Sequence, residues 1–179
     1  MIETGRLILR GWREDDVAAH HAMCADPAVM AYLGPAPSLA ESGETVARQR
    51  KVLADYRSCF WVLERRDTGA LIGWCGIKPG PVGTPIDAEP EIGWSLARTE
   101  WGQGYAREAA DAALAWGWHE MNLPTVWAIT VPANTASRAL MDRLGMTRVI
   151  DGDFDHPKFA DDDPRRRHIL YRIDRPAHV

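Results

Sequence analysis

The chain has 179 residues and a mass of 20.0 kDa, with 46% hydrophobic and 26% charged residues, a profile typical of one soluble globular domain. Its 21 basic and 25 acidic residues give a formal charge of -4, which excludes the broad positive field of a dedicated nucleic-acid-binding protein. No run approaches the ~20 consecutive apolar residues of a membrane span, and the N-terminus lacks a signal-peptide pattern, so we expect a cytoplasmic protein.

Metal-binding patterns are weak throughout the sequence. The three cysteines fall in separate predicted elements without a Cys-x-x-Cys pair, and we interpret them as small core residues: Cys24, Cys59 and Cys75. The run Asp151-x-Asp153-x-Asp155 imitates the start of a calcium loop, but His156 replaces its glycine and Asp162 its final glutamate. We therefore predict no metal site.

Elements in the first half of the chain are predicted from caps, turns and apolar runs. The acidic run Glu14-Asp15-Asp16 is expected to cap a helix that ends before Pro27, and Ser38-x-x-Glu41 is a capping box for the next helix. Asp67-Thr68-Gly69 is typical of a hairpin turn. The predicted elements are a strand over 6–11, helices over 14–24 and 39–56, strands over 59–64 and 71–78, and a strand over 91–96 after the Pro- and Gly-rich loop 79–90.

The second half alternates helices and strands. Apolar residues recur at helical spacing from Gly104 to Met121, and Gly145 is expected to end the last helix in the left-handed conformation. The predicted elements are helices over 104–121 and 134–144 and strands over 126–131, 146–150 and 168–173. This order predicts one domain over 1–179 of the α/β (α+β) class, with a mixed sheet and helices packed on its faces.

The segment from Glu91 to Ala109 carries the most specific pattern. A strand leads into the turn Trp101-Gly102-Gln103-Gly104, which opens the helix predicted from 104. Glycines permit close approach of a ligand, and the free N–H groups of a helix N-terminus favour an anion. The turn lacks the lysine of a Walker A loop, and Arg107 stands where a dinucleotide fingerprint has its third glycine. Spacing alone predicts either a phosphate-like site or a plain tight turn between strand and helix.

This run resembles the acetyl-CoA signature of the GNAT N-acetyltransferases, in the branch that includes the ribosomal-protein N-terminal acetyltransferases. Further matches cover nearly the whole chain: Thr4-Gly5-Arg6-Leu7-Ile8-Leu9-Arg10, Val131-Pro132-Ala133-Asn134-Thr135-Ala136-Ser137-Arg138, Leu144-Gly145-Met146, Asp155-His156-Pro157 and Leu170-Tyr171-Arg172. One position departs from the superfamily, which usually begins its pyrophosphate loop with Arg or Gln where this chain has Trp101. The phosphate contacts are therefore assigned to backbone groups and Gln103.

The resemblance implies a mostly antiparallel sheet of about seven strands, splayed between the fourth and fifth strands to receive the pantetheine of acetyl-CoA. It also implies a β-bulge near Ile92 and Gly93 that aims a backbone N–H at the thioester oxygen. The residues that it assigns to the cofactor are Gly93, Trp94, Ser95, Leu96, Gly102, Gln103, Gly104, Tyr105, Ala106 and Asn134. Asn134 is equally expected as a helix N-cap, which does not exclude a cofactor contact.

Acyl transfer to nitrogen requires a neutral amine. An α-amine is already about 14% neutral at pH 7, whereas a lysine costs roughly 4.6 kcal/mol to deprotonate. Glu91 is the candidate base, provided that burial raises its pKa; the alternative is an exposed acid at a strand end. Ser137 is the candidate donor of a proton to the departing thiolate, and its alternative is a hydroxyl that satisfies backbone groups of its own helix.

Two functions of different classes follow. The first is a cytosolic N-acetyltransferase in which a primary amine, on a protein N-terminus or a small molecule, attacks acetyl-CoA directly. The second is a catalytically silent acyl-CoA-binding or sensor module. A homodimer is left open, and the acceptor is not identified. Two further predictions concern charge and packing: Arg165-Arg166-Arg167 forms a self-neutralising loop with Asp161-Asp162-Asp163, and Trp61, Trp74, Trp94 and Trp127 pack in the core.

Overall fold

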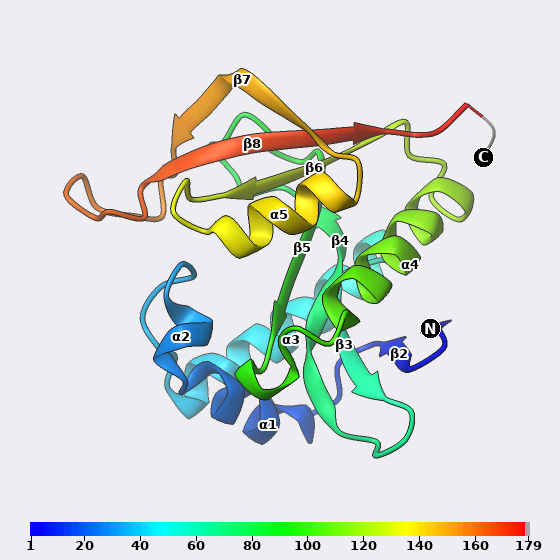
Figure 1. The fold of residues 1–179 in the computed structure, drawn as a ribbon. Coiled ribbons are helices and arrows are strands. Elements are labelled where there is room, and N and C mark those ends of the chain that lie inside the picture. The colour runs from blue at the N-terminus through cyan, green and yellow to red at the C-terminus, as the bar shows by residue number, and fades with distance from the viewer. Residues whose placement is uncertain (178–179) are drawn as a thin grey trace.

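The computed structural model describes residues 1–177 and contains one eight-stranded sheet in the order β1-β2-β3-β4-β5-β6-β8-β7 (Figure 1). The strands are β1 (Ile2–Glu3), β2 (Leu7–Arg10), β3 (Phe60–Arg65), β4 (Leu71–Pro79), β5 (Pro90–Leu96), β6 (Thr125–Thr130), β7 (Thr147–Asp155) and β8 (Arg167–Asp174). The predicted mixed, mostly antiparallel sheet is confirmed. The two-residue β1 was not predicted because it is too short to show an alternating pattern.

Among the strands described, one pair of neighbours is parallel, and these two strands separate almost at once. β5 and β6 are paired at a single position, Glu91 with Trp127, whereas β5 and β4 stay paired from Gly73 with Leu96 to Pro79 with Pro90. The splay between the fourth and fifth predicted strands is therefore confirmed. The unbroken pairing of β5 with β4 has no extra residue, so the β-bulge expected near Ile92 and Gly93 is wrong for this pair.

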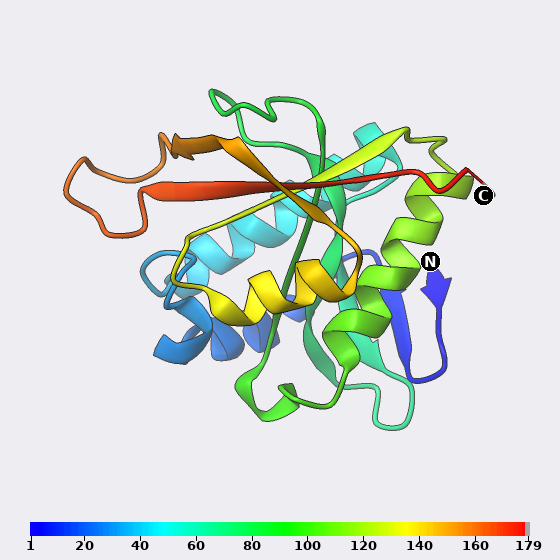
Figure 2. The ribbon, with the colours of Figure 1, turned by 45° about the horizontal axis from the view of Figure 1, so that its top comes forward.

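Within residues 1–177, five α-helices accompany the sheet: α1 (Asp16–Cys24), α2 (Pro27–Met30), α3 (Leu39–Tyr56), α4 (Tyr105–His119) and α5 (Thr135–Arg143). α4 and α5 lie on one side of the strands and α3 passes behind them, which confirms helices on both faces (Figure 2). None of these helices of residues 1–177 is long and apolar enough to span a bilayer.

The start of α3 agrees with the prediction from the sequence, because its cap is formed by two residues three positions apart. The Ser38 hydroxyl accepts from Glu41 N–H and the Glu41 carboxylate accepts from Ser38 N–H, so the capping box is confirmed. At the start of α1, Asp15 makes no side-chain cap bond, but Asp16 of the predicted acidic run accepts from Arg13 N–H at 2.7 Å. Asp16 also accepts two bonds of 2.8 Å from the Arg10 guanidinium, a buried ion pair that anchors α1 to the sheet.

The core fills the space between the sheet and the helices on both faces. Trp61 is buried there as predicted, and the half-buried Trp74 and Trp94 pack against the core. Trp127 is half-buried and is not part of this packing, so the core interpretation is wrong for that ring. All three cysteines are buried, as expected, and burial raises the pKa of Cys24 to about 11 and that of Cys59 to about 12. At neutral pH these thiols are protonated core residues.

Candidate functional site

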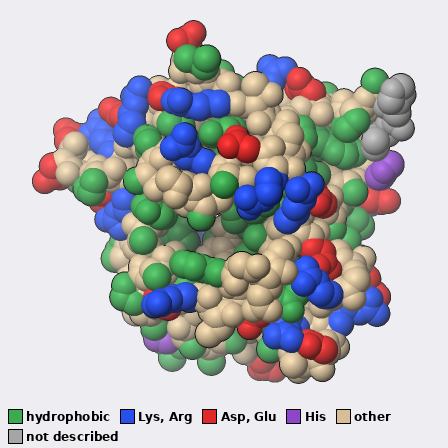
Figure 3. Space-filling view, in the orientation of Figure 1, with side chains coloured by type: hydrophobic (Ala, Val, Ile, Leu, Met, Phe, Trp, Pro, Cys, Tyr) green, Lys and Arg blue, Asp and Glu red, His purple; other side chains and the backbone are tan. Residues whose placement is uncertain are grey.

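The divergence of β5 from β6 opens a groove with a volume of 790 Å³. It is bordered by the end of β5, the glycine turn, the first turns of α4 and α5, and the segment around α2. In the space-filling view, which has the orientation of Figure 1, a hollow lies between α5 above and the α2 segment and glycine turn below, with hydrophobic side chains along it (Figure 3). A groove of this size lies within the range of about 300–1,000 Å³ that small-molecule and cofactor sites occupy.

The glycine turn presents backbone rather than side chains to this groove. Gly102 and Gly104 have φ angles of 75° and 83°, the left-handed region that glycine adopts without a steric penalty. Gly104 is the N-cap of α4 and makes no side-chain cap bond, so no capping side chain covers the first-turn amides. The turn is therefore suited to an anionic group at the positive end of α4.

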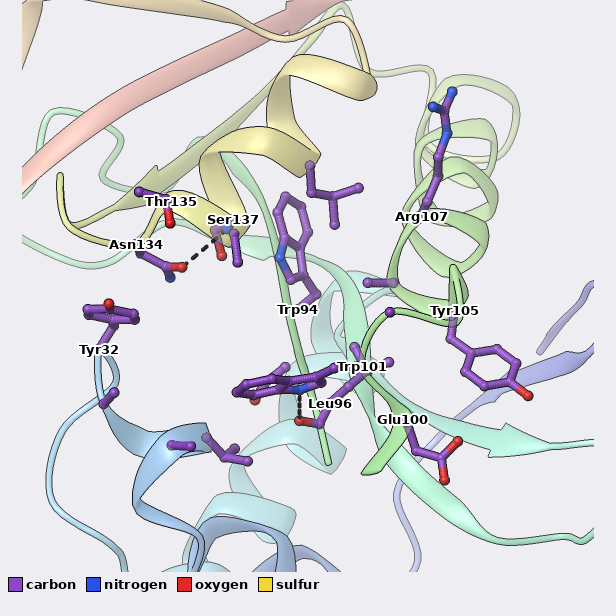
Figure 4. Close-up of a pocket in the computed structure, with 18 of the residues that line it drawn as sticks. Tyr32, Trp94, Leu96, Glu100, Trp101, Tyr105, Arg107, Asn134, Thr135 and Ser137 are labelled. Carbon is purple, nitrogen blue, oxygen red and sulfur yellow. Dashed lines mark hydrogen bonds between the residues drawn. The ribbon is translucent and has the colours of Figure 1, made fainter. Parts of the chain in front are cut away.

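Side chains around the turn hold it in place. The Trp101 indole N–H donates to the Leu96 carbonyl at 2.8 Å, and 48% of this residue remains exposed at the groove (Figure 4). The Gln103 side chain donates to the Thr99 carbonyl at 3.0 Å, and Gln103 is not among the residues that line the groove. The side-chain amide is therefore used within the turn in this structure, and the phosphate contact of Gln103 stays a prediction. Arg107, which sequence reasoning did not select, lines the groove.

On the opposite wall, Asn134 and Ser137 belong to the first turn of α5. The Asn134 side chain accepts from Ser137 N–H at 3.2 Å, which confirms the N-cap. Both residues are half-buried and face Tyr32, whose hydroxyl donates to the Ala133 carbonyl at 3.2 Å (Figure 4). This bond joins the segment after α2 to the entrance of α5 across the groove. Neither α2 nor Tyr32 was predicted from the sequence.

A second, smaller cavity of 320 Å³ adjoins the groove. The two share lining residues at their junction: Tyr32, Leu33, Trp94, Asn134 and Ser137. Two ligands that occupy the two cavities would therefore meet beside Ser137 and Trp94. The smaller cavity also contains Glu91 and Gly93 from β5 and Lys78 from β4.

Glu91 is only 8% exposed, and Lys78 Nζ lies 2.6 Å from its carboxylate. Burial raises the pKa of Glu91, while the Lys78 ammonium acts in the opposite direction. The alternative of an exposed acid at a strand end is wrong for this residue. A buried carboxylate with a raised pKa is a better proton acceptor than an ordinary glutamate.

The predicted site residues thus divide between two adjoining cavities. Those that line the groove are Trp94, Ser95, Leu96, Gly102, Gly104, Tyr105, Ala106, Asn134 and Ser137, and those that line the smaller cavity are Glu91, Gly93, Trp94, Asn134 and Ser137. The ring of Tyr105 points away from the groove and lies under Arg6, so this residue lines the groove from the helix backbone (Figure 4).

Comparison with known proteins agrees with this geometry. The model of the acetyltransferase (GNAT) domain matches residues 6–147. An uncharacterized protein of Bacillus subtilis, YkkB, is 33% identical over 144 residues, which are 80% of this chain and 83% of that protein. A crystal structure of an acetyltransferase from Agrobacterium tumefaciens is 29% identical, covers 97% of this chain and 94% of that one, and has a TM-score of 0.78.

The ribosomal-protein branch is represented among solved structures with this fold. RimL, described as a ribosomal L7/L12 α-N-protein acetyltransferase in complex with coenzyme A, is 16% identical over 96% of this chain and 95% of that one, with a TM-score of 0.76. Similarity at this level of identity shows the fold alone.

Proposed function

The chain belongs to the GNAT acetyltransferase family and is an N-acetyltransferase, and from this premise we propose that it transfers acetyl from acetyl-CoA to a primary amine by direct attack in a ternary complex. The observation that carries the proposal is the junction of the two cavities at Ser137, with a buried carboxylate in the smaller one. No covalent intermediate is required, because donor and acceptor would meet there.

The residues present fit acetyl-CoA. The uncapped amides of α4 and the left-handed glycines at 102 and 104 suit its pyrophosphate, and the strand edge from Trp94 to Leu96, left unpaired by β6, suits its pantetheine. Asn134 would contact the cofactor from α5 while it caps that helix. When bound, acetyl-CoA supplies the activated acetyl thioester.

Glu91 is the proposed general base. Its burial in the smaller cavity raises its pKa toward the range in which a carboxylate can take a proton from an ammonium group, directly or through water. Lys78 keeps the carboxylate charged and ready to accept that proton. Ser137 is the proposed proton donor to the departing thiolate, because it lines both cavities.

The test is an acetyl-CoA assay with a panel of amines, read by release of free thiol. In Glu91→Gln we expect kcat to fall by about 10²-fold with little change in coenzyme A affinity. Glu89→Gln removes an exposed carboxylate two residues away and should leave both unchanged. Unaltered turnover in Glu91→Gln would remove Glu91 from its role. Tight binding of acetyl-CoA without thiol release over any amine would favour the sensor alternative.

We further propose that residues 1–179 act as one N-acetyltransferase domain, since one sheet contains all eight strands described within residues 1–177. The run Thr4-Gly5-Arg6-Leu7 supports a place in the ribosomal-protein branch. The homodimer and the cytoplasmic location stay predictions from the sequence.

A further inference from the structure

The smaller cavity has an uneven charge lining. Two of the chain's three lysines, Lys78 and Lys158, line it, together with His156 and His168. Among the residues that line it in the described part of the chain, Glu91 is the single carboxylate. The charge inside the proposed acceptor site is therefore decided by which of these groups neutralise each other.

Glu91 and Lys78 neutralise each other. Their charged atoms are 2.6 Å apart, and Lys78 Nζ also lies 4.8 Å from the centre of the Phe60 ring. Lys78 is therefore held against the wall by a carboxylate and an aromatic face. The pair contributes little net charge to a ligand in the cavity.

Lys158 is the remaining lysine, and no acidic side chain of residues 1–177 lies within ion-pair distance of it. Its ammonium donates to the Leu33 carbonyl at 2.9 Å, which fixes it at the rim where the loop between β7 and β8 meets the segment after α2. Partial enclosure of the ammonium lowers the pKa of Lys158, and Arg165 and Arg48 lower it further. Arg165 is itself paired with Asp163 at 2.6 Å. The rim thus carries an uncompensated positive charge.

Aromatic rings form much of the remaining wall. Phe60 and Trp74 are stacked with centroids 4.7 Å apart, and Phe159 is stacked on His168 at 5.8 Å. The volume of 320 Å³ is near the lower end of small-molecule sites. Such a cavity suits a compact ligand with an apolar body.

These features disfavour a polyamine. A polyamine that places one nitrogen near Glu91 would bring a second positive charge toward Lys158, which like-charge repulsion opposes. An anionic group on the acceptor would instead pair with Lys158. The positive surroundings would also favour the neutral form of the attacking amine, which is the reactive form.

Building on the acetyl transfer proposed above, we propose that the acceptor is a free amino acid with an apolar side chain, with its amine near Glu91 and Ser137 and its carboxylate on Lys158. Its apolar side chain would lie against Phe60 and Trp74. This is the class of α-amino carboxylates with an aliphatic or aromatic side chain, and the product would be the N-acetyl amino acid plus coenzyme A with a free thiol.

The first test measures binding to the coenzyme A-loaded protein by calorimetry, with L-leucine, L-methionine and L-phenylalanine, their primary amides, and spermidine. We expect each acid to bind at least about 10-fold more tightly than its amide, and spermidine to bind more weakly than either. Equal affinity for acid and amide, or preference for spermidine, would overturn the inference.

The second test changes Lys158. In Lys158→Met the affinity and the kcat/KM for the acids should fall by about 10-fold, with less than about a 2-fold change for the amides. Lys158→Arg should restore the preference, because it keeps the charge. Lys51→Met, on the exposed face of α3, is the matched control and should behave as the unchanged protein. Equal losses for acids and amides in Lys158→Met would show a structural role only and refute the assignment.

These outcomes separate the inference from the function on which it rests. If amides or polyamines are acetylated and amino acids are not, the transferase stands and the acceptor class is wrong. If no amine is acetylated, the transferase proposal fails, while calorimetry with L-leucine and its amide still decides whether the cavity selects a carboxylate.

Discussion

The Arg6 guanidinium donates a hydrogen bond of 2.9 Å to the Gln103 carbonyl, although 97 residues separate the two in sequence. The same guanidinium donates to Glu108 at 2.7 Å and lies 4.4 Å above the Tyr105 ring. Arg6 therefore braces the glycine turn and the first turn of α4 from the N-terminal edge of the sheet. A brace of this kind holds the turn in the conformation that an anion would require.

We predict that Arg6→Met weakens coenzyme A binding by about 10-fold, the effect of losing roughly 1.4 kcal/mol of positioning and charge. Calorimetric titration with coenzyme A measures it. Arg50→Met is the control, because Arg50 is exposed on α3 and pairs with the exposed Glu14, far from the turn. An affinity in Arg6→Met equal to that of the control would show that the brace does not shape the site.

The glycine turn offers a matched pair of variants. Gly102 and Gly69 have φ angles of 75° and 70°, and an added Cβ would meet nothing within 4 Å at either position. Alanine at each should cost a similar stability, about 1–2 kcal/mol of backbone strain. We expect only Gly102→Ala to weaken coenzyme A binding, because only its backbone borders the groove. Comparable affinities in the two variants would argue against a pyrophosphate contact there.

Ser137→Ala tests the proposed proton donor. A thiol with an ordinary pKa of about 8.5 is a fair leaving group without assistance, so we expect kcat to fall by no more than about 10-fold. Thr135→Ala is the matched control, since Thr135 lines the groove but not the smaller cavity. Steady-state kinetics with acetyl-CoA compares them. Identical kcat values in the two variants would leave Ser137 with a structural role.

The decline of kcat/KM at acid pH should depend on the pKa of Glu91. Burial raises the pKa of Glu91 and Lys78 opposes this rise, so kcat/KM should decline as pH falls through that raised pKa. Removing the opposing charge in Lys78→Met should raise the pKa further and move the acid limb to higher pH. A pH-rate profile of each protein measures the shift. A limb that stays in place, or moves to lower pH, would contradict the role of Glu91 as base.

Stability should also depend on pH through His156. Burial first, and then His168, Lys158 and Lys78, lower the pKa of His156 to about 4. Between this value and the ordinary value of about 6.5 the unfolded chain binds the proton and the folded chain does not, so stability is lost as pH falls through this window.

Urea unfolding of the unchanged protein and of His156→Gln, each at pH 7 and at pH 4.5, measures this effect. The full pKa shift corresponds to at most about 3 kcal/mol in the free energy of unfolding. Because the ring is only partly enclosed, we expect this free energy to fall from pH 7 to pH 4.5 by about 1–2 kcal/mol more in the unchanged protein than in the variant. Equal losses of unfolding free energy in the two proteins would show that protonation of His156 does not affect stability in this pH range.

Local signals in the sequence determined the local structure of this protein. The capping box at Ser38, the hairpin turn that ends at Gly69 and the helix stop at Gly145 were all predicted and are present, because each depends on residues a few positions apart. The glycine turn before α4 was placed by the same kind of signal. The N-cap of α5 was likewise selected from its position in a predicted helix, whereas the candidate base was selected from its strand position together with the family resemblance.

Tertiary packing alone decided how these pieces make a site. Two contacts of the site join residues that are far apart in the sequence: Arg6 with Gln103, 97 positions apart, and Lys158 with Leu33, 125 positions apart. No local sequence pattern predicts either contact. Lys78 lies opposite Glu91 because β4 and β5 pair without any shift of register, and the same unbroken pairing leaves no place for the expected bulge. Distances of this kind depend on how the whole sheet pairs and twists, and they set the charge of the acceptor cavity.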